Sequence, residues 1–402
     1  MVRARDLGIV IGEGRPGPSN AITDVSGVRV GHATIVDGSG PLVVGRGPIR
    51  TGVTVVVPHD GDIWREPVFA APHVLNGNGE VTGLEWIREA GMLGGALAIT
   101  NTHSVGVVRD ALVAEGIRSQ PPGSFFWSLP IVGETWDGML NDTDGQHVRA
   151  EHLVAALADA RPGPVAEGNV GGGTGMVCHE FKGGIGTASR KLRPADGGWT
   201  VGVLVQANYG RRGLLTVDGV PVGREIDLDA VPSPYGRARR GFEPFTDDGA
   251  DPSTAGSPAR QRDGSIIIIV ATDAPILPHQ CRRLAQRSSL GLARAGGLGS
   301  TSSGDFVLCF ATGNRALPIP EVLRASPGVS TVRMLADLAL DPLFEATVEA
   351  TEEAIVNALV AARTMTGRDG ITAHALPHDR LVEVMGKYGR LRGVSPSQRV
   401  NR

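Results

Sequence analysis

The chain is short of cysteine, of aromatic side chains and of net charge. Three cysteines occur in 402 residues, far apart and without a Cys-x-x-Cys pair, which favours reduced thiols over disulfides. Aromatic residues make up 4% of the chain and the formal net charge is −3, so the charge balance gives no reason to expect nucleic acid as a partner. No apolar run approaches the roughly 20 residues of a membrane span, and none near Met1 has the length of a signal peptide. We therefore expect a cytoplasmic protein without a membrane partner.

Glycine, in contrast, is abundant, with 57 residues, and predicts many tight turns and close backbone approaches. Apolar runs rich in β-branched residues and bounded by Gly, Pro, Asn or Asp predict buried strands. These runs lie at 53–57, 96–100, 201–205, 266–270 and 306–310. Segments with helical periodicity lie between them, at 83–90, 105–115, 149–159, 277–294 and 341–365. The pattern predicts an α/β protein in which helices cover sheet, without fixing the strand order.

One segment, residues 232–263, breaks this pattern. It contains Ser-Pro, Asp-Asp-Gly, Asp-Pro-Ser and Ala-Gly-Ser-Pro and has no sustained periodicity, which predicts an exposed linker. A loop of roughly 30 residues inside a compact domain is uncommon and asks for an explanation. A domain boundary is one explanation, and a surface segment that is cut is another.

The linker ends at Asp263-Gly264-Ser265, where a fully apolar run begins. A serine hydroxyl needs a base to become a good nucleophile, and an N-terminal serine carries one in its own α-amino group. The unperturbed pKa of that amine is about 7.7–8.0. Glycine at 264 tolerates a strained backbone and leaves its carbonyl open to attack by the Ser265 hydroxyl. A turn that simply precedes a buried strand is the simpler local interpretation, and self-cleavage is the alternative.

Further motifs accompany this junction in a recognisable order. Together they resemble peptidase family S58, the L-aminopeptidase/D-esterase and β-peptidyl aminopeptidase family. The motifs lie at residues 20–32, 76–83, 132–138, 169–176, 205–210, 264–280 and 303–305. The resemblance implies an αββα sandwich like that of N-terminal-nucleophile hydrolases. It implies one self-processing domain, 1–402, cut into an α fragment, 1–264, and a β fragment, 265–402, which remain associated because they share a sheet.

The resemblance also implies catalytic roles. Ser265 matches the nucleophile, and Asn208 in Gln-Ala-Asn-Tyr-Gly matches the amide that donates to the oxyanion. Ser303 and Asp305 match a serine and an acid that form a polar network with the α-amine. The family more often has Glu at the acidic position, and Asp is one methylene shorter, which leaves open whether its carboxylate reaches the network directly or through a water molecule. Read from local sequence alone, Asn208 is a strand cap and Ser303-Gly-Asp305 a solvated turn.

Two residues are expected to bind substrate. Glu134 in Val-Gly-Glu-Thr matches the acid that receives the substrate's free amino group through a charge-assisted hydrogen bond. Its alternative interpretation is an exposed loop glutamate. Trp136 stands where some relatives carry Tyr, and an indole N–H cannot exchange a proton as a phenol does, so we expect Trp136 to line the pocket.

Other candidate motifs are weaker. The run Gly171-Gly-Gly-Thr-Gly175 lacks the Lys-Ser/Thr ending of a phosphate loop, and the histidines show no recognised metal spacing, so no cofactor or metal is expected. Glu352-Glu353, in the last long helical segment, is expected to be solvated.

The favoured hypothesis is a self-cleaving serine aminopeptidase or esterase that acts on short peptides, aminoacyl amides or esters. The resemblance implies that it assembles as a homotetramer. A self-processing acyltransferase resembling ornithine acetyltransferase is one alternative, although threonine is its usual nucleophile. An unprocessed, non-enzymatic protein that binds small molecules is the other.

Overall fold

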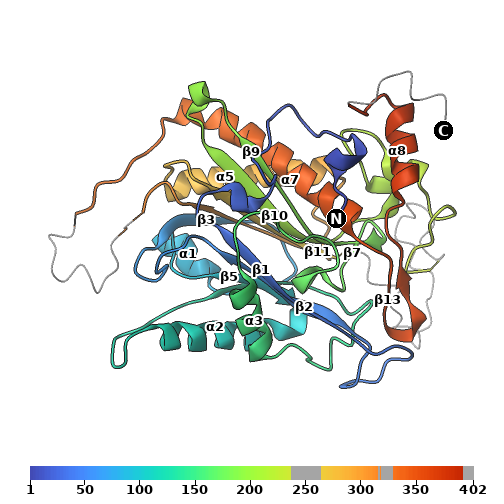
Figure 1. Cartoon of the computed structure of the whole chain (residues 1–402), viewed down its shortest axis with the longest axis horizontal. Helices are drawn as coiled ribbons and strands as arrows, with labels where there is room; N and C mark the ends of the chain where they lie inside the picture. The colour runs from blue at the N-terminus through green and yellow to red at the C-terminus, as the bar shows by residue number, and fades with distance from the viewer. Residues whose placement is uncertain (237–263, 316, 318–328, 393–402) are drawn as a thin grey trace.

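Two stacked β-sheets lie between two layers of helix in the computed structural model (Figure 1). The structure describes residues 1–236, 264–315, 317 and 329–392. Most of the expected linker, residues 237–263, lies outside the described residues. The expected αββα sandwich and the predicted α/β class are thus confirmed. No helix in the described part of the chain combines the length and apolar character needed to cross a bilayer.

The larger sheet has six strands in the order β4-β3-β12-β11-β10-β9. Strands β11 and β12 are parallel, and the other neighbouring pairs are antiparallel. Its strands span Val68–Gly77 (β3), Met92–Leu93 (β4), Gly184–Lys191 (β9), Thr200–Asn208 (β10), Ser265–Thr272 (β11) and Gly304–Ala311 (β12). The smaller sheet, in the order β1-β2-β5-β6, contains Arg29–Asp37 (β1), Ile49–Val57 (β2), Leu97–Asn101 (β5) and Ile131–Thr135 (β6).

Helices cover the outer face of each sheet. Helices α5 and α7 pack on the six-stranded sheet, and α2 and α3 pack on the four-stranded sheet (Figure 1). The helices span Leu84–Ala90 (α1), Val105–Ser119 (α2), Ala150–Asp159 (α3), Val222–Glu225 (α4), Pro278–Arg294 (α5), Asp341–Ala361 (α7) and His378–Lys387 (α8). Two small two-stranded sheets consist of Val177–Cys178 (β7) with Phe181–Lys182 (β8), and of Met365–Thr366 (β13) with Thr372–Ala373 (β14).

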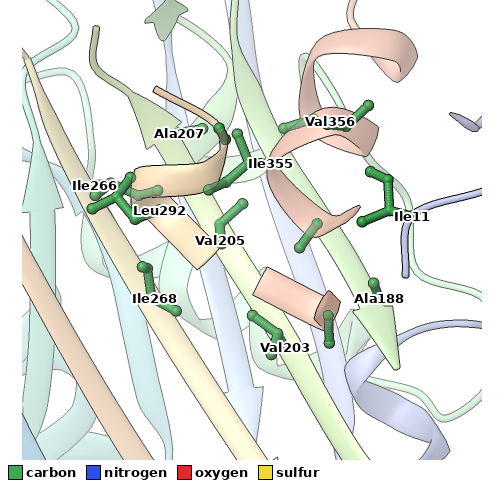
Figure 2. Close-up of a cluster of buried hydrophobic side chains, with 14 of the residues drawn as sticks. Ile11, Ala188, Val203, Val205, Ala207, Ile266, Ile268, Leu292, Ile355 and Val356 are labelled. Atoms are coloured by element: carbon green, nitrogen blue, oxygen red, sulfur yellow. The ribbon is translucent and has the colours of Figure 1, made fainter. Parts of the chain in front are cut away.

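Strand β11 is buried along its whole length, because both of its faces are covered. Ile266 and Ile268 point into the core beneath α5 and α7, where they lie with Val203, Val205 and other apolar side chains (Figure 2). Ile267 and Ile269 point into the core between the two sheets. Side chains alternate along a strand, so a central strand covered on both faces is a continuous apolar run. This is why the run after Ser265 could be recognised in the sequence.

Two predictions in the last long helix were wrong. Helix α7 ends at Ala361 rather than at residue 365, because the Asn169 side chain pairs with the backbone N–H and C=O of Arg363 and holds that stretch extended. Glu352 and Glu353 are buried rather than solvated, with Glu353 paired to Arg5 and Arg190. The helix is buried over most of its surface, so a charged residue in it is no sign of a solvated face.

Candidate active site

The ends of three neighbouring strands, β10, β11 and β12, lie together at one end of the six-stranded sheet. Ser265 begins β11, and its antiparallel partner at this edge is Asn208, the last residue of β10. On the other side, β12 starts beside it in parallel, with Asp305 opposite Ile266. The sheet thus brings the predicted nucleophile, oxyanion donor and acid together, although they are far apart in the sequence.

Ser265 is 7% exposed, and its side chain lies among polar groups. The backbone N–H of Gly304 donates to Ser265 Oγ at 3.1 Å. The Ser303 hydroxyl lies within hydrogen-bond distance of two acceptors, the Gly264 carbonyl oxygen and Asp305 Oδ1. A hydroxyl has one proton, so it donates to one of these acceptors at a time. Ser303 therefore links the carbonyl before the nucleophile to the acid.

Asp305 reaches this network directly. Its Oδ1 lies 2.6 Å from Ser303 Oγ, so the shorter side chain needs no bridging water at this contact. The pairing of β12 with β3 shifts register between Asp305 and Phe306, an irregularity of the kind that re-aims side chains near sites. The side chain of Asn76, opposite Asp305 on β3, donates to the Ser303 carbonyl and fixes the turn before β12.

Position 264 has room only for glycine. A Cβ atom built on Gly264 would lie 1.6 Å from the Asn208 carbonyl oxygen and 2.8 Å from Asn208 Nδ2. Real Cβ atoms do not approach other atoms so closely, so any larger residue would push the junction away from β10. The close approach places the Gly264–Ser265 peptide beside the Asn208 side chain.

The Asn208 side chain is held at both ends. Its Oδ1 accepts from the Val177 N–H at 2.8 Å, and its Nδ2 donates to the Trp136 carbonyl at 2.9 Å. An amide has two Nδ2 protons, so the second remains for a group in the adjoining cavity. Val177 lies two residues after the glycine run at 171–175, whose first three residues form a turn that packs against β2 and β10.

Glu134 comes from the other sheet, on β6, and is 3% exposed rather than a loop residue on the surface. The Glu80 N–H donates to its Oε1 at 3.0 Å, and the Thr102 hydroxyl donates to its Oε2. Burial raises the pKa of Glu134, although these two hydrogen bonds oppose that shift. The Glu134 carboxylate is therefore shielded from water and, among the described residues, receives hydrogen bonds only from uncharged groups. Because no counter-ion in the described part of the chain neutralises it, this arrangement favours the binding of a cation.

A cavity of about 220 Å³ connects these groups. It is lined by Asn78, Gly79, Thr102, Glu134, Trp136, Asn208, Tyr235, Gly264, Ser265 and Ser302. Ser303 and Asp305 lie behind Ser265 and line a much smaller space beside Tyr209. A larger, mostly apolar cavity of about 360 Å³ lies around Trp64, Trp86 and Trp127 and contains none of the predicted site residues.

Sequence reasoning missed several contributors to this site. The Gly304 N–H and the Glu80 N–H are backbone donors, which no side-chain motif reveals. Thr102 could have been found, because it follows a predicted strand just where polar residues collect at a sheet edge. Tyr235 lies in the segment that the sequence assigned to the linker. Among the described residues, no group of three or more His, Cys, Asp or Glu side chains is arranged to hold a metal ion.

Comparison with known proteins gives a consistent result. The model of peptidase family S58 matches residues 20–373. A β-peptidyl aminopeptidase of Sphingosinicella microcystinivorans is 48% identical over 389 residues, 97% of this chain and 93% of the relative. Among solved structures, a Burkholderia sp. β-aminopeptidase is 51% identical with a TM-score of 0.85, covering 98% of this chain and all of its own.

A second solved structure resembles the chain nearly as well. The L-aminopeptidase D-Ala-esterase/amidase of Ochrobactrum anthropi is 42% identical, with a TM-score of 0.82 over 97% of this chain and 99% of its own. That enzyme is described as a prototype for the serine aminopeptidases and as a variant of the N-terminal-nucleophile hydrolase fold. From the matched family model and these relatives, this chain belongs to peptidase family S58.

Proposed function

We propose that the protein is a self-cleaving serine aminopeptidase that removes N-terminal aminoacyl groups from short peptides, amides or esters. The observation that carries the proposal is the junction at the sheet edge: Ser265 begins a central strand, and the carbonyl before it is held by the Ser303 hydroxyl. The aminopeptidase relatives support hydrolysis over acyl transfer and over simple binding.

Self-cleavage uses the intact junction. Ser265 Oγ attacks the Gly264 carbonyl carbon, the C–N bond breaks, and the amine takes a proton while an ester joins Gly264 to the serine oxygen. Water then hydrolyses this ester and releases a carboxyl group on Gly264 and a free Ser265 hydroxyl. The donor from Ser303 stabilises the charge that develops on the Gly264 oxygen. The Asn208 amide, whose Nδ2 lies beside Gly264, is assigned as a second donor to the same oxygen. The products are an α fragment, 1–264, and a β fragment, 265–402.

The new α-amino group of Ser265 is the catalytic base of the mature enzyme. It is formed beside the Ser303 hydroxyl, which Asp305 orients at 2.6 Å. The amine takes the Ser265 hydroxyl proton while Oγ attacks the substrate carbonyl, and the free Nδ2 proton of Asn208 binds the resulting oxyanion. The protonated amine then gives its proton to the leaving group, and water releases the acyl-enzyme.

Glu134 selects substrates with a free amino group. Its buried carboxylate faces the same cavity as Ser265, and its present partners, the Thr102 hydroxyl and the Glu80 N–H, are uncharged. A substrate ammonium would supply the missing positive charge and place the first carbonyl of the substrate near the nucleophile. Trp136 and Tyr235 form the aromatic part of the wall.

Two further features remain proposals that rest on the family resemblance and the composition. We propose that the protein works in the cytoplasm, as its reduced thiols suggest, with all three cysteines free and buried. We also propose that it assembles as a homotetramer, which size-exclusion chromatography with light scattering would test.

Intact-mass measurement of the purified protein tests the proposed function. We expect two polypeptides, one starting at Met1 and one at Ser265, and release of amine from aminoacyl p-nitroanilides. Ser265→Ala should yield one uncut, inactive chain. Ser39→Ala, at an exposed serine outside the cavity lining, should process and react normally. An uncut wild-type chain that persists after prolonged incubation would refute the proposal.

A further inference from the structure

Lys182 is a completely buried lysine near the site that the mechanism has not used. It lies at the end of β8, and its Nζ donates to the carbonyl oxygens of Met176 and Gly183 at 2.8 Å each and of Gly173 at 3.2 Å. An ammonium group has three protons, so all of them are used. All three partners are uncharged carbonyls, which makes this an unusual way to hold a buried charge.

Burial of an ammonium group without a counter-ion costs free energy. The cost appears as a pKa for Lys182 that burial lowers to about 7, although the neighbouring Cys178 opposes this shift. A hydrophobic residue of similar length would avoid this cost. The three carbonyl acceptors match the three protons of the charged form, so a lysine in this place is a candidate for a functional role.

The contacts of Lys182 lead to the oxyanion donor in two steps. The Met176 carbonyl, which accepts from Lys182, belongs to the same peptide group as the Val177 N–H. That N–H donates to Asn208 Oδ1 at 2.8 Å. Asn208 Nδ2, at the other end of the same amide, faces the cavity. An ammonium, a peptide group and a carboxamide thus lie in one hydrogen-bonded row that ends at the site.

Polarisation along such a row strengthens its last donor. A positive charge at the oxygen of a peptide group draws electron density from the nitrogen and makes its N–H a stronger donor. The same effect, passed to Asn208 Oδ1, makes the Nδ2 protons stronger donors toward an oxyanion. The row also fixes which way the Asn208 amide points, because only Oδ1 can accept from Val177.

From this geometry we infer that Lys182 is a positioning residue that orients and polarises Asn208 for oxyanion binding. The inference rests on the proposed function, because it assigns Lys182 a part in the same reaction. It concerns both steps of that reaction, since self-cleavage and substrate hydrolysis each pass through a tetrahedral intermediate. A purely structural lysine is the competing explanation, and stability measurements distinguish the two.

Lys182→Met is the main test. Full removal of an oxyanion donor lowers kcat by about 100- to 1,000-fold, so loss of its polarisation should lower kcat by about tenfold. We expect KM to change less than about twofold and self-cleavage to slow by a factor similar to that of kcat. Thermal stability should change little, because removal of a buried charge opposes the loss of a donor at the Gly173 and Gly183 carbonyls, while the Gly183 N–H still binds the Met176 carbonyl. Lys191→Met, an exposed lysine on β9, is the matched control and should change neither rate nor stability.

A double-mutant cycle tests the route through Asn208. In an Asn208→Ala background, Lys182→Met should have little further effect on the rate of self-cleavage, because the donor it acts on is gone. Equal losses in both backgrounds would overturn the inference. Should the methionine variant fail to fold, Lys182→Gln keeps a donor without charge and should show the same loss of kcat. A wild-type chain without cleavage or activity would refute the proposed function instead, and an active wild type with an equally active Lys182→Met would refute only the role of Lys182.

Discussion

Two buried glutamates show how differently this protein treats a charge inside its core. Glu353, on α7, accepts from Arg5 Nε and Arg190 Nη2 at 2.7 Å each and from Asn20 Nδ2 at 2.6 Å. Glu134, on β6, accepts from one hydroxyl and one backbone N–H, and it faces a cavity. The first is enclosed by two guanidinium groups, and the second has neutral donors and open space.

The pKa values of the two carboxyl groups reflect this difference. Burial raises both, but the charges of Arg190 and Arg5 outweigh burial at Glu353, so its pKa is lowered. At Glu134 burial prevails over the hydrogen bonds from Thr102 and the Glu80 backbone, and its pKa is raised. The carboxylate of Glu353 thus has its counter-ions within the fold, whereas that of Glu134 has neutral donors and an open side toward the cavity.

The largest effect on the reaction is expected at Asn208, which donates to the oxyanion in the proposed mechanism. Asn208→Ala removes a donor to the oxyanion and should lower kcat and the rate of self-cleavage by about 100- to 1,000-fold. Single-turnover assays and mass spectrometry of the precursor measure the two rates. Asn208→Asp keeps the shape but loses the donor, so a wild-type rate in that variant would contradict the assigned role.

A smaller effect on the reaction, a loss of kcat/KM, is expected from Glu134→Gln. A hydrogen bond to a charged partner contributes about 1.5–3 kcal/mol, so kcat/KM for free-amine substrates should fall by about 10- to 100-fold. Substrates whose amino group is acetylated should be hydrolysed equally by both enzymes. Glu89→Gln, an exposed glutamate on α1 outside the cavity lining, is the matched control and should leave kcat/KM unchanged.

The raised pKa of Glu134 also predicts a dependence on pH. Ammonium binding needs the ionised carboxylate, so kcat/KM should fall as pH decreases through this pKa, beginning at a higher pH than for an exposed glutamate. The stability of the protein without substrate should depend on pH in the opposite direction. A carboxyl group with a raised folded-state pKa stabilises the fold at low pH, and this contribution is lost as pH rises through the folded-state pKa. Glu134→Gln should lack the acidic decline in kcat/KM, and a decline that persists in the variant would assign it to another group.

The smallest effect on the reaction, and the largest on stability, is expected from Glu353→Gln. Removing one member of a buried ion pair costs up to about 3–5 kcal/mol; here Arg5 loses this carboxylate and Arg190 keeps only its pair with Glu349. Urea unfolding should show this loss, while kcat of the remaining folded enzyme stays near the wild-type value. Glu345→Gln, at an exposed position on the same helix, should change neither. A variant with normal stability and low kcat would break the distinction between the two glutamates.

Much of the fold could be predicted from the sequence because its central strands are buried on both faces. The strands that begin near residues 200, 265 and 304 are almost uninterrupted apolar runs. Strand β9 was not recognised, because Thr187, Ser189 and Arg190 are polar residues satisfied by distant partners. Burial of Glu353 was missed for the same reason, since no local pattern reveals Arg5 and Arg190, 348 and 163 residues away, and Glu352 is likewise bound by the distant Asp218 N–H.

The candidate site could be predicted only through the resemblance. Local sequence favoured a simple turn at Gly264-Ser265 and a strand cap at Asn208, because hydrogen bonds such as Ser303 to Gly264 join residues distant in sequence. Pairing of β10 with β11 makes Asn208 the neighbour of Ser265, and that pairing is a property of the sheet. Backbone donors such as the Gly304 N–H cannot be predicted from residue type, because every residue except proline has a backbone N–H.

The position of Gly264 makes cleavage of the chain dependent on its folding. Its carbonyl meets the Ser303 hydroxyl only when β12 lies beside β11, and its Cα fits against Asn208 only when β10 lies on the other side. Under the proposed mechanism, the cut therefore waits until strands from three distant parts of the chain are in register. Hydrolysis of the ester is then practically irreversible, so a chain that is cut at Gly264–Ser265 must have reached the folded state at least once. The fraction of cut chains in a preparation would count the molecules that have reached the native sheet, including any that have since unfolded.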